Sequence, residues 1–178
     1  MARETSLDNL VVVPADSSVR EIDRVLSVSG KPAKPIRKLL AGAKSNFDVV
    51  VLDCPPGLST VVEVVASVAD VLLVPVVPEP LPFRALDRFK DFLSDTGSAS
   101  PKLVAPFLSM IDRRKPVHRR VEAEVLATGR FLGAAIPESS SVARLAEEQV
   151  PVVVSAPRSL AAAEYRKLWA ETTERAGI

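Results

Sequence analysis

The chain has 178 residues, a formal net charge of +1, one histidine and one cysteine. A single cysteine excludes internal disulfides, and one histidine with one cysteine does not make up the ligand set of a structural zinc site. Hydrophobic residues make up 47% of the chain, yet no apolar run approaches the roughly 20 residues that span a bilayer. We therefore expect a single domain over residues 1–178, located in the cytoplasm and without a membrane partner.

Apolar runs alternate with amphipathic segments along the chain, in the order typical of β-α-β units. The predicted strands are 10–13, 49–52, 71–77, 103–110 and 133–136, with 152–154 as a candidate short edge strand. The predicted helices are 18–28, 35–43, 60–68, 83–94, 117–127, 142–148 and 160–176, and residues 94–101 are predicted to form a surface loop. This order predicts an α/β fold with a mostly parallel sheet flanked by helices.

One aliphatic run, residues 49–52, lies between two aspartates and is followed by Pro55-Pro56-Gly57. Four consecutive aliphatic residues predict a strand buried on both faces. Asp53 then lies at the carboxyl end of that strand, where open α/β sheets bind ligands. The alternative is an aspartate that only caps the next turn.

The run from Asp53 to Leu58 resembles the Walker B and switch II element of the ParA/MinD family of partition ATPases. Other segments resemble motifs of that family in the same order: residues 9–15, 69–79, 107–113, 136–137, 150–151 and 164–166. The resemblance extends over roughly residues 7–170. It implies the P-loop NTPase fold of the deviant Walker A type, and a role in chromosome or plasmid partitioning.

The resemblance implies nucleotide contacts for seven residues: Asp53, Pro55, Pro56, Gly57, Asp112, Arg113 and Pro137. It also implies that Asp53 holds Mg²⁺ through a water molecule. For Asp53 a structural turn role is the alternative, and for Asp112 and Arg113 an exposed ion pair at a strand end. The chain departs from the family's Ile-Pro-Arg-Asn at Glu138 and Ser139, which removes one cation from the expected site.

No G-x-x-x-x-G-K-[ST] run occurs in the 178 residues. Such a loop cradles phosphates with its backbone N–H groups and supplies the lysine and the magnesium-binding hydroxyl. We therefore expect a sheet without the P-loop strand, an exposed edge at residues 49–53, and no hydrolysis by this chain alone. Two functions stay open: a degenerate, non-hydrolysing binding or regulatory module, and an ATPase whose loop, with ATP and Mg²⁺, comes with upstream sequence or another chain. The implied partners are the chain itself or a complete ParA-like protein, and a ParB-like protein.

Two cationic clusters stand out against the small net charge. The first surrounds the start of the helix after Pro116 and comprises Arg113, Arg114, Lys115, Arg119 and Arg120. Cations at a helix amino end oppose the macrodipole, so this cluster is a candidate site for an anionic partner such as nonspecific DNA. The second comprises Lys31, Lys34, Arg37, Lys38 and Lys44, with no acidic residue between Asp23 and Asp48. A solvated surface is the alternative for both clusters.

Overall fold

The computed structural model describes residues 2–15, 21–95 and 101–178. Its contacts divide the chain into two compact units, Met1–Val68 and Ala69–Ile178. The single domain over residues 1–178 stays a prediction. The start of the predicted helix 18–28 and most of the predicted loop 94–101 lie outside the described residues.

The first unit begins with a short hairpin and continues with three helices. Strands β1 (Arg3–Glu4) and β2 (Val11–Val12) pair antiparallel, with Arg3 opposite Val12. Asn9 in the connection has a φ of 63°, a conformation that asparagine tolerates better than most residues. The strand predicted at 10–13 is therefore confirmed in position, but it belongs to a hairpin.

The helices of this unit are α1 (Ile22–Ser27), α2 (Ala33–Ala43) and α3 (Thr60–Ala66). Ser59 caps the amino end of α3, and its hydroxyl accepts the N–H of Val62 at 3.4 Å. Asp23 accepts the neighbouring N–H of Val61 at 3.0 Å, and this bond joins α1 to the amino end of α3. Two side chains thus satisfy donors that the first turn of a helix otherwise leaves unpaired.

The strand predicted at residues 49–52 is wrong. Residues 47–59 form neither helix nor strand, and Val51 is 81% exposed. A strand is stable only when its backbone groups are paired with a neighbour, and no described segment pairs with this one. The aliphatic pattern indicated the β-propensity of the segment correctly, but it could not supply the missing partner.

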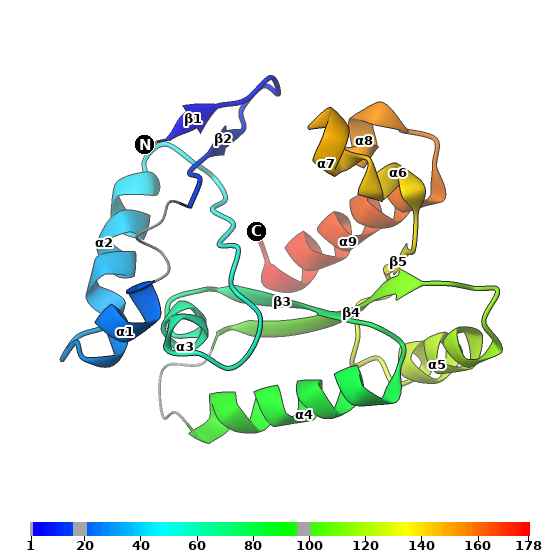
Figure 1. The fold of residues 1–178 in the computed structure, drawn as a ribbon, viewed down its shortest axis with the longest axis horizontal. Helices are drawn as coiled ribbons and strands as arrows, with labels where there is room; N and C mark the ends of the chain where they lie inside the picture. Colours follow the sequence, from blue (N-terminus) through cyan, green and yellow to red (C-terminus); the bar gives the residue numbers. More distant parts are fainter. Residues whose placement is uncertain (1, 16–20, 96–100) are drawn as a thin grey trace. The chain divides into compact units, whose positions relative to one another are not determined.

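The second unit contains a parallel sheet, as predicted, and three of the predicted strands form it. Strands β3 (Val71–Val76), β4 (Leu103–Ile111) and β5 (Ala135–Pro137) are adjacent in that order. Val71 lies opposite Leu103, and the pairing continues without a shift to Val76 and Leu108. Helices α4 (Pro80–Asp95) and α5 (Pro116–Ala127) connect the strands, and α9 (Leu160–Ala176) follows them (Figure 1).

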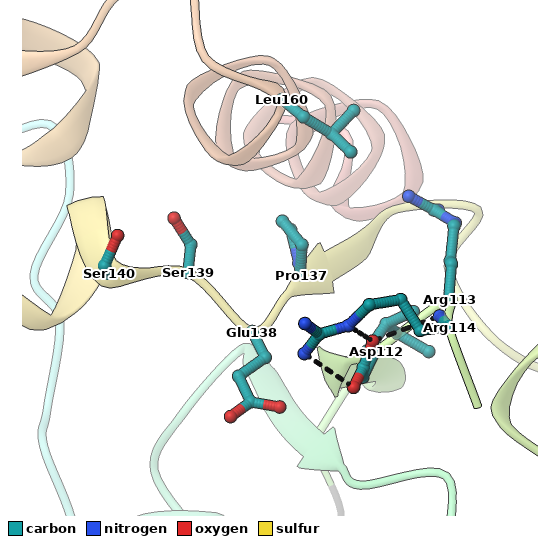
Figure 2. A pocket seen from close by; sticks show the side chains of 9 residues that line it. Asp112, Arg113, Arg114, Pro137, Glu138, Ser139, Ser140 and Leu160 are labelled. Carbon is teal, nitrogen blue, oxygen red and sulfur yellow. Dashed lines mark hydrogen bonds and ion pairs between the residues drawn. The ribbon is translucent and has the colours of Figure 1, made fainter.

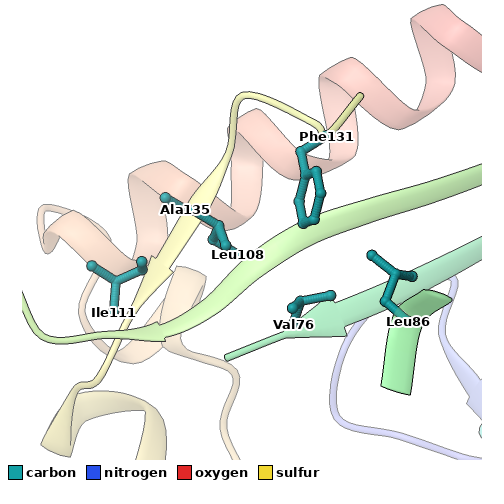
Figure 3. Packing of buried hydrophobic residues seen from close by; sticks show 6 residues of the cluster. All are labelled: Val76, Leu86, Leu108, Ile111, Phe131 and Ala135. Carbon is teal, nitrogen blue, oxygen red and sulfur yellow. The ribbon is translucent and has the colours of Figure 1, made fainter. Parts of the chain in front are cut away.

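The two faces of the sheet each carry a hydrophobic cluster. The cluster toward α4 and α5 comprises Val76, Leu86, Leu108, Ile111, Phe131 and Ala135 (Figure 3). The cluster toward α9 comprises Ala105, Phe107, Leu132, Ala134, Ile136 and Leu168. Successive residues of a strand point to opposite faces, which explains why Phe107 and Leu108 belong to different clusters.

A bulge interrupts this alternation near the end of β4. The pairing of β4 with β5 shifts between Leu108 and Ile111, and Met110 has a φ of 56°. Because the bulge adds one residue, Ile111 packs in the same cluster as Leu108, although the two are three positions apart. The bulge therefore sets the orientation of the residues that directly follow, beginning with Asp112.

Three short helices follow β5: α6 (Ser140–Ala143), α7 (Leu145–Glu148) and α8 (Val152–Ser155). They replace the single helix predicted at 142–148, and the candidate edge strand at 152–154 is wrong, because this segment is helical. Val152 is buried, α8 packs against α9, and Arg166 of α9 donates to the carbonyl of Val153 at 3.2 Å. These contacts outweigh the strand propensity of three consecutive valines.

Helix α9 also binds the backbone that leads into β5. Glu171 accepts the N–H of Gly133 at 2.6 Å and that of Ala134 at 3.2 Å, and Glu164 accepts the N–H of Ala135 at 2.9 Å. Lys167 donates to the carbonyl of Gly133 at 2.8 Å. These bonds occupy backbone groups that an edge strand otherwise exposes. Among the described residues, no helix is both long and apolar enough to cross a membrane.

Candidate nucleotide-type groove

The carboxyl ends of β4 and β5 border an open groove of about 530 Å³ in the second unit. Its lining includes Asp112, Arg113, Arg114, Pro137, Ser139 and Leu160 (Figure 2). The parallel strands bring residues 111–114 and 137–140 to the same edge of the sheet, which is the edge where α/β proteins bind ligands. Three residues expected to contact a nucleotide, Asp112, Arg113 and Pro137, therefore line one groove.

Asp112 and Arg114 form a bidentate ion pair at this edge. The Nε of Arg114 lies 2.8 Å from Oδ1 of Asp112, and Nη2 lies 3.0 Å from Oδ2 (Figure 2). The backbone N–H of Arg114 also donates to Oδ1 at 3.0 Å. The hydrogen bonds from the Arg114 side chain, and then the one from its backbone, lower the pKa of Asp112 to about 2.

The sole histidine, His118, binds the backbone of Asp112. His118 is buried in α5, and its Nδ1 accepts the backbone N–H of Asp112 at 3.1 Å. An accepting Nδ1 leaves the proton of a neutral imidazole on Nε2. His118 thus joins the start of α5 to the end of β4, a role that the sequence did not reveal because the two residues belong to different elements.

Arg113 forms an ion pair with Glu122 of α5. Its Nε and Nη2 lie 3.1 and 2.5 Å from the two carboxylate oxygens, and this contact raises the pKa of the Arg113 guanidinium. Arg119 donates to the carbonyl of Arg113 at 2.8 Å. Arg113 lines the groove, but its charge is already compensated within the chain.

The cluster proposed for DNA is therefore less cationic than its sequence indicates. Arg113, Arg114 and Arg120 each face a carboxylate, the last at 3.8 Å from Glu124. Lys115 and Arg119 form no ion pair with any described residue, and both are exposed. Five cations and three carboxylates between residues 112 and 124 leave a net charge of +2.

The other four nucleotide candidates, from Asp53 to Gly57, belong to the first unit and are not among the residues that line this groove. Asp53 is exposed and forms no hydrogen bond or ion pair with the described residues. Gly57 has a φ of 97°, so the turn after Pro55 and Pro56 depends on a glycine. Burial, and then the charge of Asp53, raise the pKa of the Cys54 thiol.

Asp53 and its neighbours do not by themselves form a magnesium site. No group of three or more His, Cys, Asp or Glu side chains in the described parts of the chain is arranged to hold a metal ion. Asp53 offers a single carboxylate, whereas Mg²⁺ in NTPase sites also takes a hydroxyl ligand and phosphate oxygens.

Comparison with known proteins agrees with the fold and the motif order. A family model described as an AAA domain (AAA_31) matches residues 1–101. The chromosome partitioning protein ParA of Caulobacter vibrioides is 26% identical over 98% of the chain and 68% of its own length. The chain belongs to the ParA/MinD family. The virulence plasmid ParA family protein pGP5-D of Chlamydia psittaci is also 26% identical, over 94% of the chain and 65% of its own length.

A solved structure supports the same fold. The Pyrococcus furiosus cell division ATPase MinD superposes on this ParA/MinD-family chain with a TM-score of 0.69 and 21% identity, over 97% of the chain and 69% of MinD. At this identity the likeness shows the α/β fold of P-loop NTPases alone. The chain spans about two thirds of the length of the ParA proteins it matches, 65% and 68%.

Proposed function

We propose that this ParA/MinD-family chain acts in chromosome or plasmid partitioning as a binding or regulatory module that does not itself hydrolyse ATP. The observation that carries the proposal is the groove at the carboxyl ends of β4 and β5, where Asp112, Arg113 and Pro137 come together. The same 178 residues contain no Walker A run, so they hold no loop of that kind to cradle a triphosphate.

The groove has the composition of a site for a flat, polar ligand. Pro137 and Leu160 contribute apolar surface, whereas Ser139 and Arg114 contribute polar groups. Small-molecule sites combine apolar walls with a few placed polar groups in this way. A nucleotide base fits such a groove. The guanidinium of Arg114 can contact the base only when its ion pair with Asp112 opens.

The partners follow from the same family membership. We propose that the chain associates with itself or with a complete ParA-like protein, and that a ParB-like protein regulates the assembly. A complete partner would bring the Walker A loop that these residues lack. In that case the Asp53–Gly57 segment would act as a switch element of a composite site, which is the alternative function of a ParA-family ATPase.

Calorimetric titration with ATP and ADP, each with Mg²⁺, separates these two functions. The module function predicts no phosphate release by the isolated chain, and at most weak nucleotide binding that Pro137→Ala reduces and Asp53→Ala leaves unchanged. ATP hydrolysis by the isolated chain that is lost in Asp53→Ala would refute the module and restore the ATPase. Hydrolysis that appears only after addition of a complete ParA protein, and depends on Asp53, would establish the composite site.

A second function, nonspecific DNA binding, is supported by Lys115 and Arg119, the two cations of the cluster without an ion pair. Duplex DNA should bind with a salt dependence typical of phosphate contacts, and Lys115→Ala/Arg119→Ala should lower the slope of log K against log salt by about 2. Arg120→Ala is the matched control, because Arg120 already faces Glu124 and should matter less. Equal binding by all three proteins would exclude this surface.

A further inference from the structure

The groove at the carboxyl ends of β4 and β5 is lined by four charged side chains, and one of them has no partner among the described residues. Arg113 is paired with Glu122, and Arg114 with Asp112. Glu138 also lines the groove, and it is exposed. Its carboxylate forms neither a hydrogen bond nor an ion pair with any residue that the structure describes. A ligand in the groove therefore meets one uncompensated charge, which is an acceptor.

The backbone holds Glu138 at the groove. Its N–H donates to the carbonyl of Ile111 at 3.0 Å, and the next residue, Ser139, caps helix α6. The Glu138 side chain extends to the side of the chain on which Arg114 and Asp112 lie (Figure 2). Hydrogen bonding to Asp112, and to a smaller extent the charge of Glu138, raise the pKa of the Arg114 guanidinium. Glu138 thus lies within electrostatic reach of Arg114 without forming an ion pair with it.

The chemistry of a free carboxylate limits which flat ligand fits beside it. An ionised carboxylate only accepts hydrogen bonds, and its two oxygens accept best from two parallel N–H groups. Pro137 and Leu160 add the apolar surface on which a flat ring can lie. Among the nucleobases, guanine alone presents two N–H donors on neighbouring atoms of one edge, its ring N1–H and its 2-amino group. Adenine presents an acceptor beside its amino group, so one carboxylate oxygen would face a lone pair.

We infer that Glu138 makes this groove selective for guanine, because its carboxylate accepts the N1–H and one N–H of the 2-amino group of the base. The inference rests on the proposed binding of a base in the groove, and it names the base. Glu138 is available without the loss of any contact to a described residue, whereas Arg114 must first leave Asp112. Adenine is rejected because it would desolvate the carboxylate without supplying both donors.

Calorimetric titration of the full chain with the monophosphates GMP, AMP and IMP tests this inference. Monophosphates are suitable because the 178 residues contain no Walker A run to hold a longer phosphate chain. GMP should bind about tenfold or more tightly than AMP, which is the discrimination that one bidentate base contact provides. IMP keeps the N1–H but lacks the 2-amino group, so its affinity should lie between those of GMP and AMP.

A substitution of the same shape should reverse the preference. In Glu138→Gln the carboxamide places a donor beside an acceptor, which is the pattern that the N1 and the 6-amino group of adenine require. AMP should then bind more tightly than GMP, a result that a mere loss of structure would not produce. Glu147→Gln is the matched control, because Glu147 is exposed on α7 and does not line the groove. This control should keep the preference for GMP, and circular dichroism of each variant establishes that it is folded.

Three results would overturn the inference: AMP binding as tightly as GMP, an unchanged preference in Glu138→Gln, or no binding of any of the three monophosphates. Each of them leaves the proposed module in place, because that function fails only if the isolated chain hydrolyses ATP. Binding of argininamide as tight as that of GMP, and lost in Glu138→Gln, would assign Glu138 to an arginine side chain of a protein partner instead.

Discussion

Removal of the Glu171 carboxylate should destabilise the second unit strongly, although Glu171 lies on a helix and 23% of its side chain is exposed. Its Oε2 accepts two backbone N–H groups, from Gly133 at 2.6 Å and from Ala134 at 3.2 Å. Hydrogen bonds to a charged acceptor contribute about 1.5–3 kcal/mol, and a buried donor without a partner costs about 1–3 kcal/mol. Ala134 is fully buried, so water cannot readily replace the lost acceptor at that position. We expect Glu171→Ala to lower the free energy of unfolding by about 2–4 kcal/mol.

Urea unfolding measures this change, and the chain provides its own reporter. Trp169, the sole tryptophan, lies on the same helix two residues from Glu171, so its fluorescence follows the loss of α9 from the sheet. Glu174→Ala is the control, because Glu174 is exposed on α9 and should change stability by less than about 0.5 kcal/mol. Equal, small effects of the two substitutions would refute the argument that Glu171 closes the edge of the sheet.

Three further predictions concern the backbone that leads into β5 and the residues at the groove. Gly133→Ala would place a Cβ 2.7 Å from the Glu171 carboxylate, and because that side chain must move, we expect a loss of about 1–2 kcal/mol in urea unfolding. Asp112 has a pKa lowered to about 2, so its pairing with Arg114 stabilises the fold above the unfolded pKa of about 4 and is lost as pH falls toward 2. In Asp112→Asn the slope of stability against pH should therefore be smaller between about pH 4 and 2, and an unchanged acid titration would contradict the assignment. His118→Ala leaves the N–H of Asp112 without its acceptor and should cost about 1–3 kcal/mol, whereas His118→Asn should recover part of this if its oxygen reaches the same N–H.

The elements whose bounds were predicted well are those whose local sequence marks where they begin and end. The helix predicted at 160–176 is confirmed at both ends, and the structure shows a local signal at each: Ser159 caps its amino end and Gly177, in the left-handed region, ends it. Strands β3 and β4 were predicted to within one residue because each is an aliphatic run flanked by helices. The grouping of Asp112 with Pro137 was implied by the family resemblance, and the parallel pairing of β4 with β5 accounts for it.

The failures have a common physical cause, which is dependence on a partner distant in sequence. Residues 49–52 have the composition of a strand but no described neighbour to pair with. Val152–Ser155 is helical because α9 packs on it and Arg166 binds its backbone. The contact of Arg113 with Glu122 spans nine positions and crosses from a loop into a helix, so no local pattern indicates that this cation is compensated.

At the bulge, the number of residues in β4 matters separately from which residue occupies position 110. The Met110 side chain is 55% exposed, so many substitutions there should leave the packing intact. Deletion of Met110 would leave Ile111 two positions from Leu108 and on the same face, whereas insertion of one residue there would turn Ile111 away from the cluster that the two share. The backbone N–H that now meets His118 would turn with it, and the Asp112 carboxylate would leave the groove. Evolution of this strand can thus exchange side chains at position 110 for others that tolerate a positive φ, but one added residue would dismantle the site.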